Sequence, residues 1–344
     1  MKLRSIPIFI LTLLVSSSVF AQKWDILKDE LIFQSPPFKN CHASTLVETN
    51  DGNIIISCFG GTREGASDVA IWNTVYDKMS QQYSPPSKIE DGRINDTSSF
   101  PLWNPVLFKR NDGRIFLFYK KGPNPREWSG LYTTSDDNGL SWNKVVALPK
   151  DILGAIKNKP IQLENGTVVA PSSVELNSGK WFSTVEISAD NCNSWQRYII
   201  DSSHYDVIQP SIIQHKNGSL SVLLRSKQGR ILTSSSRDGK TWSPIKKTNL
   251  ANPNSGIDAV TLKNGGYLIV YNPDVPGRDW WEGRAKLRVA YSKNGKKWKD
   301  ILILEDKPKG EFSYPSIIQT SDGLVHLTYT YDRVNIKHVV LKKR

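Results

Sequence analysis

Residues 135–142 read SDDNGLSW, and this stretch decides the fold because the chain repeats it. Residues 188–195 read SADNCNSW, with cysteine in place of glycine. Shorter versions at 236–242 (SRDGKTW) and 292–298 (SKNGKKW) keep the serine, the glycine and the tryptophan. We expect each copy to close a tight turn between two strands, with its tryptophan packed between neighbouring sheets. Four copies at similar spacing predict a repeat protein and give these residues a structural role.

A second marker alternates with the first. Asn-Gly or Asp-Gly pairs between alternating apolar runs predict β-hairpins. Six such pairs end at Gly52, Gly113, Gly166, Gly218, Gly265 and Gly323. A period of about 50 residues, almost wholly strand and turn, predicts an all-β fold, a six-bladed β-propeller. We expect residues 29–35 to add an outer strand to the last blade beside 335–341 and close the ring. One or two β-sandwiches are the alternative.

The N-terminus predicts export. The chain opens with MKLR, continues with an apolar run over 6–20 and reaches Ala21 through small residues. This pattern is typical of a secretory signal peptide, residues 1–21, cut after Ala21. About 15 apolar residues are too few to span a bilayer comfortably. We therefore expect a secreted or periplasmic protein with a single propeller domain over 22–344, no membrane insertion and a monomeric state.

The net charge and the cysteine content limit the classes of ligand and cofactor that we expect. The net charge is +12, which favours anionic partners such as acidic sugars, nucleic acid or a membrane surface. Only the terminal Lys342–Arg344 resembles a nucleic-acid-binding arm, so we expect an acidic glycan and no nucleic acid. Three cysteines, Cys41, Cys58 and Cys192, cannot all pair internally. No His/Cys cluster has zinc spacing, and we expect neither a metal nor an organic cofactor.

One polar residue opens the first strand of each predicted hairpin. In a propeller this strand lines the central channel, and the residue at its start faces one end of the ring. The six residues are His42, Asn104, Lys159, Gln209, Asp258 and Tyr314. All are polar and no two are alike, which predicts a binding site on the axis. The alternative is that each one satisfies local backbone groups.

The second strands end in further polar groups that we expect on the rim of the same face. They are Arg63, Glu64, Lys120, Glu175, Arg225 and Asn272. Several basic groups suit an anionic ligand, because arginine binds carboxylate through two parallel hydrogen bonds. The loop GRDWWEGR at 277–284 adds Trp280 and Trp281, which would either stack on a sugar or pack between blades.

The SxDxGxxW turns, known as Asp-boxes, together with the sixfold β repeat and the predicted export, resemble the sialidase (neuraminidase) superfamily and its bacterial BNR/Asp-box branch. The resemblance covers nearly all of the chain after the predicted signal peptide. It implies an exported exo-glycosidase that removes a terminal sialic-acid-like or other acidic sugar. Sialidases share three arginines that hold the substrate carboxylate, a tyrosine nucleophile with a glutamate partner, and an aspartate acid/base.

Several segments carry this resemblance at the level of single residues. VLLRSKQGRI implies that Arg225 binds the substrate carboxylate, and GRAKLRVAYS implies the same for Arg284. FSYPSIIQTSDG resembles the nucleophile strand and implies Tyr314 as the nucleophile. GGTREGASDVAIW resembles the first-blade segment and implies Arg63 as an anion ligand and Asp68 as the acid/base.

The chain departs from the family pattern at two positions. Its first strand reads Cys41-His42-Ala43 where the family has Arg-Ile-Pro, so His42 replaces one arginine of the triad. Gln209 falls where the family has the glutamate that deprotonates the tyrosine. A tyrosine with the ordinary pKa of about 10 is a weak nucleophile without such a base.

These departures leave several roles open. Glu175 is a substitute base, and Glu64 is an alternative to Asp68 as the acid. One alternative function is a polysaccharide lyase that acts on a uronate-containing glycan, in which His42 and Tyr314 transfer protons. Another is a carbohydrate-binding propeller without catalytic activity.

Overall fold

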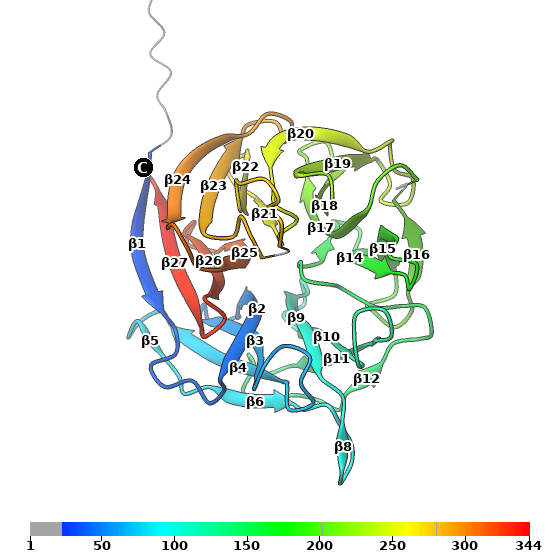
Figure 1. Cartoon of the computed structure of the whole chain (residues 1–344), viewed down its shortest axis with the longest axis vertical. Helices are drawn as coiled ribbons and strands as arrows, with labels where there is room; N and C mark the ends of the chain where they lie inside the picture. The colour runs from blue at the N-terminus through cyan, green and yellow to red at the C-terminus, as the bar shows by residue number, and fades with distance from the viewer. Residues whose placement is uncertain (1–22, 201–202, 280) are drawn as a thin grey trace, which may run out of the picture.

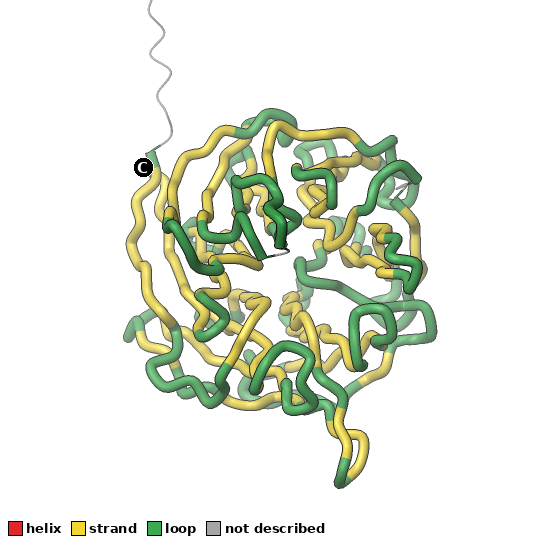
Figure 2. The backbone as a smooth tube through the Cα atoms, viewed as in Figure 1, coloured by secondary structure: helices red, strands yellow, loops and turns green. Residues whose placement is uncertain are grey.

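The computed structural model describes residues 23–200, 203–279 and 281–344. Six sheets of its strands are arranged around a central axis, a two-stranded hairpin lies apart from them, and the described residues contain no helix (Figures 1 and 2). The prediction of a six-bladed all-β propeller is therefore confirmed. No helix long and apolar enough to span a membrane occurs in the described part of the chain. The predicted signal peptide and Trp280 lie outside the described residues.

The blades follow one another along the chain. Blade 1 contains β2 (Asn40–Glu48), β3 (Ile54–Gly61), β4 (Ala70–Asp77), β5 (Gln82–Tyr83) and β6 (Ser87–Glu90). Blade 2 contains β9 (Leu102–Lys109), β10 (Ile115–Lys121), β11 (Ser129–Ser135) and β12 (Val146–Ala147). Blade 3 contains β13 (Ile161–Gln162), β14 (Val168–Glu175), β15 (Trp181–Ser188) and β16 (Gln196–Ile199).

The second half repeats this order. Blade 4 contains β17 (Val207–Gln214), β18 (Leu220–Ser226), β19 (Arg230–Ser236) and β20 (Lys246–Ala251). Blade 5 contains β21 (Asp258–Thr261), β22 (Tyr267–Tyr271), β23 (Lys286–Ser292) and β24 (Lys299–Asp306). Blade 6 contains β25 (Phe312–Gln319), β26 (Val325–Tyr331), β27 (Asn335–Lys343) and β1 (Trp24–Leu31). The hairpin of β7 (Arg93–Asn95) and β8 (Ser98–Ser99) projects from the edge of the ring (Figure 1).

The N-terminal strand closes the ring. β1 pairs antiparallel with β27, from Trp24 opposite Lys343 to Leu31 opposite Lys337. Closure by an outer strand agrees with the expectation, but the strand ends at Leu31, so the range 29–35 was placed too late. Residues 32–35 turn away after Leu31, where Ile32 N still donates to Ile336 O at 2.9 Å.

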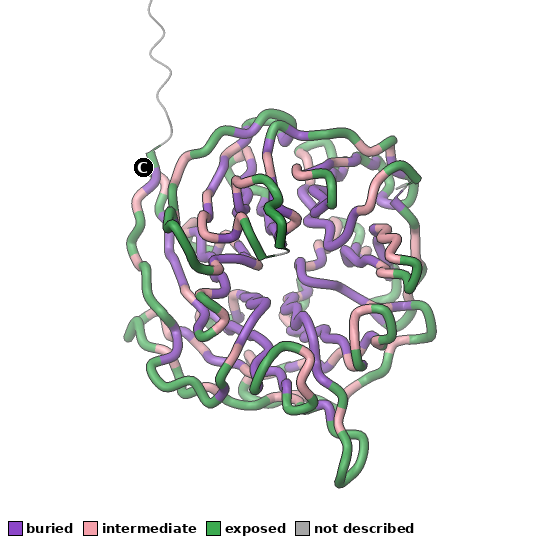
Figure 3. Tube along the Cα trace, in the orientation of Figure 1, coloured by how far each residue is buried: buried purple, intermediate pink, exposed green. Residues whose placement is uncertain are grey.

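Each pair of neighbouring blades encloses its own hydrophobic cluster. The six clusters lie between blades 1 and 2, 2 and 3, 3 and 4, 4 and 5, 5 and 6, and 6 and 1. Buried residues accordingly concentrate on the inner strands and exposed ones on the periphery (Figure 3). The Asp-box tryptophans belong to these clusters: Trp195 of blade 3 lies edge-on to Phe118 of blade 2, with ring centroids 6.0 Å apart. The turns therefore join sheets, as their spacing predicts.

The Asp-box turns share one hydrogen-bond pattern. Ser135 Oγ donates to Asp137 Oδ1 at 2.7 Å and accepts from Gly139 N at 2.8 Å. In the third blade Cys192 N donates to Ser188 Oγ at 2.9 Å. Cys192 adopts the same left-handed backbone as the glycine it replaces, with φ of 71°. All three cysteines are buried and unpaired.

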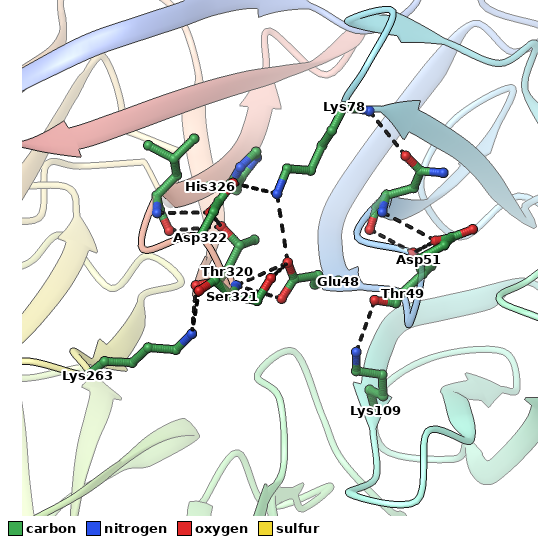
Figure 4. A network of polar contacts seen from close by, with 12 residues as sticks. Glu48, Thr49, Asp51, Lys78, Lys109, Lys263, Thr320, Ser321, Asp322 and His326 are labelled. Atoms are coloured by element: carbon green, nitrogen blue, oxygen red, sulfur yellow. Dashed lines mark hydrogen bonds and ion pairs between the residues drawn. The ribbon is translucent and has the colours of Figure 1, made fainter.

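We call the face where the innermost strands begin the front face, and the face with the six Asn-Gly or Asp-Gly hairpin turns the back face. On the back face a polar network joins blade 6 to blade 1 (Figure 4). Lys78 Nζ lies 2.5 Å from Asp322 Oδ2 and 3.8 Å from Glu48 Oε1. Glu48 Oε2 accepts from Ser321 N at 2.8 Å. The ring closure is thus reinforced by charged hydrogen bonds as well as by β1.

Candidate active site

Four innermost strands begin with a β-bulge whose first residue is left-handed. The values of φ are 54° for Ala43, 44° for Asn104, 52° for Gln209 and 53° for Tyr314. The pairing with the second strand shifts at each of these positions. A non-glycine residue with positive φ is uncommon, and bulges re-aim side chains. In blade 1 the equivalent residue is Ala43, so aligning His42 with Tyr314 is one residue out of register.

Blades 3 and 5 depart from this pattern. In blade 3 the left-handed residue is Lys157, with φ of 67°. Lys159 Nζ instead lies 2.8 Å from Asp258 Oδ2, and Asp258 is fully buried. Asp258 also accepts hydrogen bonds from Ser211 Oγ at 2.8 Å and Ile317 N at 3.0 Å. Lys159 and Asp258 therefore tie blades 3 to 6 together by their charges, inside the ring.

Tyr314 lies at the centre of the remaining polar residues. Its phenolic oxygen accepts a hydrogen bond from Arg225 Nη1 at 2.6 Å. The same nitrogen donates to Gln209 Oε1 at 3.1 Å, and Arg225 Nε donates to Asn254 Oδ1 at 2.9 Å. The guanidinium group is thus fixed against the phenolic oxygen, where it would stabilise a phenolate.

Two further arginines meet on one carboxylate. Glu311 Oε1 accepts from Arg284 Nη1 at 2.9 Å, and Oε2 accepts from Arg333 Nε at 2.7 Å. Burial alone would raise the pKa of Glu311, but the two guanidinium groups hold it below its ordinary value. Arg333 also pairs with Glu64. Sequence reasoning missed Arg333 because it lies in the turn after β26, outside the repeated segments; its φ of 56° was not visible in the sequence.

His42 is buried against Tyr314. Its imidazole is 2% exposed, and the ring centroids of the two residues are 4.1 Å apart. Nδ1 of His42 has no hydrogen-bond partner among the described residues. Burial, followed by the charges of Arg333 and Arg284, lowers the pKa of His42 well below 6.5. The imidazole is therefore neutral near pH 7 and has a nitrogen lone pair available as a proton acceptor.

Lys157 supports the tyrosine from beneath. Its ammonium donates to Ile257 O at 3.0 Å and to Pro315 O, so it joins blade 3 to blades 5 and 6. A Cβ on Gly256 would lie 3.1 Å from Tyr314 Cγ and 3.2 Å from Lys157 Cε, so both side chains rest on this glycine. Burial lowers the pKa of Lys157 to about 7. The sequence pattern predicted Lys159 as the pocket residue of this blade and did not indicate Lys157.

The loop between β3 and β4 carries the candidate acids. Asp68 is exposed, and its Oδ2 accepts from Thr62 N at 2.9 Å and Thr62 Oγ1 at 2.6 Å. Arg63 is exposed on the same loop, whereas Glu64 is engaged by Arg333. Of the two acids that the sequence left open, Asp68 is the one that forms no ion pair within the described residues.

Glu175 and Lys120, two other predicted site residues, form no hydrogen bond with Tyr314 within the described residues. Glu175 ends β14, and burial raises its pKa although Arg225 opposes this. No hydrogen bond joins Glu175 to Tyr314 within the described residues. Lys120 is fully buried and donates to Ala155 O at 2.8 Å, so it is not a rim residue.

Two predicted ligand contacts differ strongly in exposure. Asn104 is 6% exposed at its bulge, whereas Trp281 is 49% exposed on the loop over residues 277–284. Trp281 is thus largely exposed to solvent, whereas Asn104 is enclosed within the ring.

Comparison with known proteins agrees with this architecture. The family model described as a BNR repeat-like domain matches residues 52–327. A sialidase from Clostridium perfringens is 24% identical over 327 residues, which cover 78% of this chain and 83% of that protein. A structure of a Dyadobacter fermentans protein of unknown function superimposes with a TM-score of 0.76 at 15% identity, covering 93% of this chain and 99% of that one.

Solved sialidases share the fold at similarly low identity. The Hadza microbial sialidase Hz136 has a TM-score of 0.75 at 16% identity, covering 88% of this chain and 66% of that one. The Trypanosoma rangeli sialidase has a TM-score of 0.68 at 18% identity, covering 88% and 55%. Because the family model spans more than half of the chain, the protein belongs to the BNR repeat-like domain family of the sialidase superfamily.

Proposed function

We propose that the protein is an exo-glycosidase of the sialidase type, which hydrolyses a terminal sialic-acid-like or other acidic sugar from a glycan. The observation that carries the proposal is the 2.6 Å contact between the phenolic oxygen of Tyr314 and Arg225, beside Arg284 and Arg333. The proposal includes export through the signal peptide predicted over residues 1–21.

The electrostatics of this cluster favour an anionic sugar. Three guanidinium groups, of Arg225, Arg284 and Arg333, face two carboxylates, of Glu311 and Glu64. Arg225 has no carboxylate partner among the described residues, so the charge excess lies beside Tyr314. A substrate carboxylate would complete the charge balance at that point. A neutral tyrosine suits such a substrate, since an anionic nucleophile would be repelled by the adjoining carboxylate.

The residues present support a two-step displacement. Tyr314 oxygen attacks the anomeric carbon, its proton passes to neutral His42, and Arg225 stabilises the developing phenolate charge. Asp68 protonates the leaving oxygen and then deprotonates the water that releases the sugar from Tyr314. Gln209 cannot accept the tyrosine proton because an amide is not a base at neutral pH.

The test is incubation of the purified protein with a fluorogenic sialoside and a panel of sialylated oligosaccharides. Hydrolysis predicts a saturated free sugar, identified by mass, with no new ultraviolet absorbance. Substituting Tyr314→Phe should abolish its release. Turnover by the Tyr314→Phe variant, or an unsaturated product, would reject the proposal.

One observation favours a second candidate function. The buried, neutral imidazole of His42, with Nδ1 unpaired, is also suited to remove a proton alpha to a uronate carboxylate. In this lyase reaction a double bond forms as the C–O bond to the leaving sugar breaks, and Tyr314 donates the proton to that oxygen. Uronate oligosaccharides belong in the same panel, because the unsaturated product absorbs in the ultraviolet. Binding without turnover on any substrate would indicate a carbohydrate-binding propeller.

A further inference from the structure

The back face carries a large groove at the hairpin turns of blades 3, 4 and 5. Its volume is about 1430 Å³, and it lies between the turns that end at Gly166, Gly218 and Gly265. Its lining includes Gln214 at the end of β17, whereas Gln209 near the start of that strand contacts Arg225 at the front. Five residues of extended strand separate the two by about 17 Å. The groove is therefore distinct from the Tyr314 cluster.

The charge of this back groove is strongly positive. The lysines that line it are Lys159, Lys216, Lys263, Lys293 and Lys296. Glu164 is the one acidic residue of the lining. Positive charges gathered around a groove raise the local electrostatic potential, which attracts an incoming polyanion.

The five lysines differ in whether their ammonium groups already have partners in the protein. Lys159 is paired with Asp258, and Lys263 Nζ donates to Thr320 O and Ser321 O (Figure 4). The remaining three, Lys216, Lys293 and Lys296, are exposed and form no ion pair within the described residues. Three ammonium groups on two neighbouring blades are thus available to one extended anionic ligand.

The uncharged part of the lining points to a glycan. The lining also contains amide and hydroxyl groups, which belong to Asn165, Asn217, Asn294, Ser235 and Thr261. Such groups exchange hydrogen bonds with sugar hydroxyls.

The same lining is poorly suited to nucleic acid. The two aromatic side chains of the lining, Tyr267 and His215, are bonded to each other, with the Tyr267 hydroxyl 2.7 Å from His215 Nδ1. Tyr267 is 6% exposed, and His215 Nε2 is also bonded, to Ser221 Oγ at 2.8 Å, so neither ring is free for the base stacking that single strands require. No arginine, the residue best suited to clamp phosphate, lines the groove in the described part of the chain.

We propose that the back groove is a second binding site, which holds a chain of an acidic polysaccharide bearing carboxylate or sulfate groups. The site goes beyond the proposed hydrolysis and does not depend on it. It would hold the protein on a polymer while the front face acts on a chain end.

The experiment measures the affinity of the full mature chain for heparin, as a sulfated probe, and for polygalacturonate, as a carboxylate probe, at several salt concentrations. The test variant is Lys216→Ser with Lys293→Ser and Lys296→Ser. The matched control removes three exposed lysines elsewhere, Lys144, Lys246 and Lys247, by the same substitutions. Both variants keep the front-face residues unchanged.

We expect at least about tenfold weaker binding for the test variant, with a salt dependence shallower by about two to three charges, and no such loss for the control. Release of sugar from a small soluble sialoside should be equal in all three proteins, so the outcome is independent of the proposed hydrolysis. Equal affinity of the test variant and the natural chain would overturn the site. An equal loss in the control would show that the binding depends only on overall charge. Single-stranded DNA serves as a third probe, and tighter binding of DNA than of both glycans through the same lysines would assign the groove to nucleic acid.

Discussion

The ring of Tyr314 lies against the imidazole of His42, with centroids 4.1 Å apart and planes inclined by 48°. The two residues come from β25 and β2, the innermost strands of blades 6 and 1, which ring closure makes neighbours. Arg225 fixes the phenolic oxygen. Tyr314 is therefore in contact with a neutral imidazole through its ring and with a permanent cation through its oxygen.

Removal of the phenolic oxygen should stop catalysis and leave the fold intact. We expect Tyr314→Phe to lower kcat by about 10³-fold or more, because a nucleophile or proton donor is lost. The ring still packs on Gly256, so the thermal midpoint should change little. Tyr198→Phe, on the outer strand β16, is the matched control. Initial rates and thermal melts of the three proteins decide the assignment, and unaltered kcat in Tyr314→Phe would contradict it.

A carboxylate at position 209 should increase hydrolysis. Gln209→Glu places a base 3.1 Å from the Arg225 nitrogen that also donates to Tyr314, and general bases typically contribute about 10²-fold or more. Arg225 offsets the cost of burying the new charge. We expect a higher kcat on a sialoside, with Gln214→Glu at the far end of β17 as the control. A lower rate of Gln209→Glu on the sialoside would contradict a role for position 209 as the site of the missing base.

Arg333 should act on substrate binding. Arg333→Gln removes the ion-pair partner of Glu64 and of one carboxylate oxygen of Glu311, which makes the site less positive. Loss of one charged hydrogen bond to a carboxylate costs about 1.5–3 kcal/mol, or about 10- to 100-fold in kcat/KM. We expect the change mainly in KM. The control is Arg288→Gln, whose partner Asp306 lies on β24. Steady-state kinetics that show equal effects of both substitutions would exclude a role for Arg333.

Acid should destabilise the blade 6 core through its histidine pair. His326 Nδ1 and His338 Nε2 lie 3.0 Å apart, and burial lowers the pKa of His326 to about 4 and that of His338 well below 6.5. The unfolded chain binds protons first, at pH about 6.5, so stability is lost as the pH falls from about 6.5 to about 4. His326 alone should contribute about 2 kcal/mol of loss between pH 7.5 and about pH 5.

Urea unfolding at these two pH values measures that loss. His326→Gln should reduce it, whereas His204→Gln, at an exposed position, should not. If the acid-induced loss of unfolding free energy were the same in all three proteins, groups other than His326 would be responsible for that loss.

The fold could be predicted from the sequence because the motifs that determine it are local and repeated. An Asp-Gly turn between alternating strands, or the serine and tryptophan of an Asp-box, determines structure within a few residues, and repetition multiplies the signal. The boundary of β1 was less visible, since a strand that pairs with the far end of the chain is fixed by its partner. The sequence placed it several residues too late for that reason.

The candidate active site could be predicted only in part, because β-bulges and turns determine where its side chains lie. A bulge shifts the register by one residue, which moved the equivalent of Tyr314 in blade 1 from His42 to Ala43. Lys157 and Arg333 both have left-handed backbones outside the repeated segments, and no pattern marks them. Lys157 contacts Pro315 across the ring, and Arg333 contacts Glu311 between two loops of blade 6, neither of which a pattern along one strand reports.

The pairing of β1 with β27 sets an order of events during synthesis. β1 leaves the ribosome before every other strand of the propeller, and its partner leaves after all of them. The first five blades are free to assemble on the nascent chain, but β1 has no strand to pair with until β27 has been made. Tyr314 belongs to the same late segment. A chain interrupted before β25 would thus lack both Tyr314 and the partner of β1, so every chain able to close the ring also contains Tyr314.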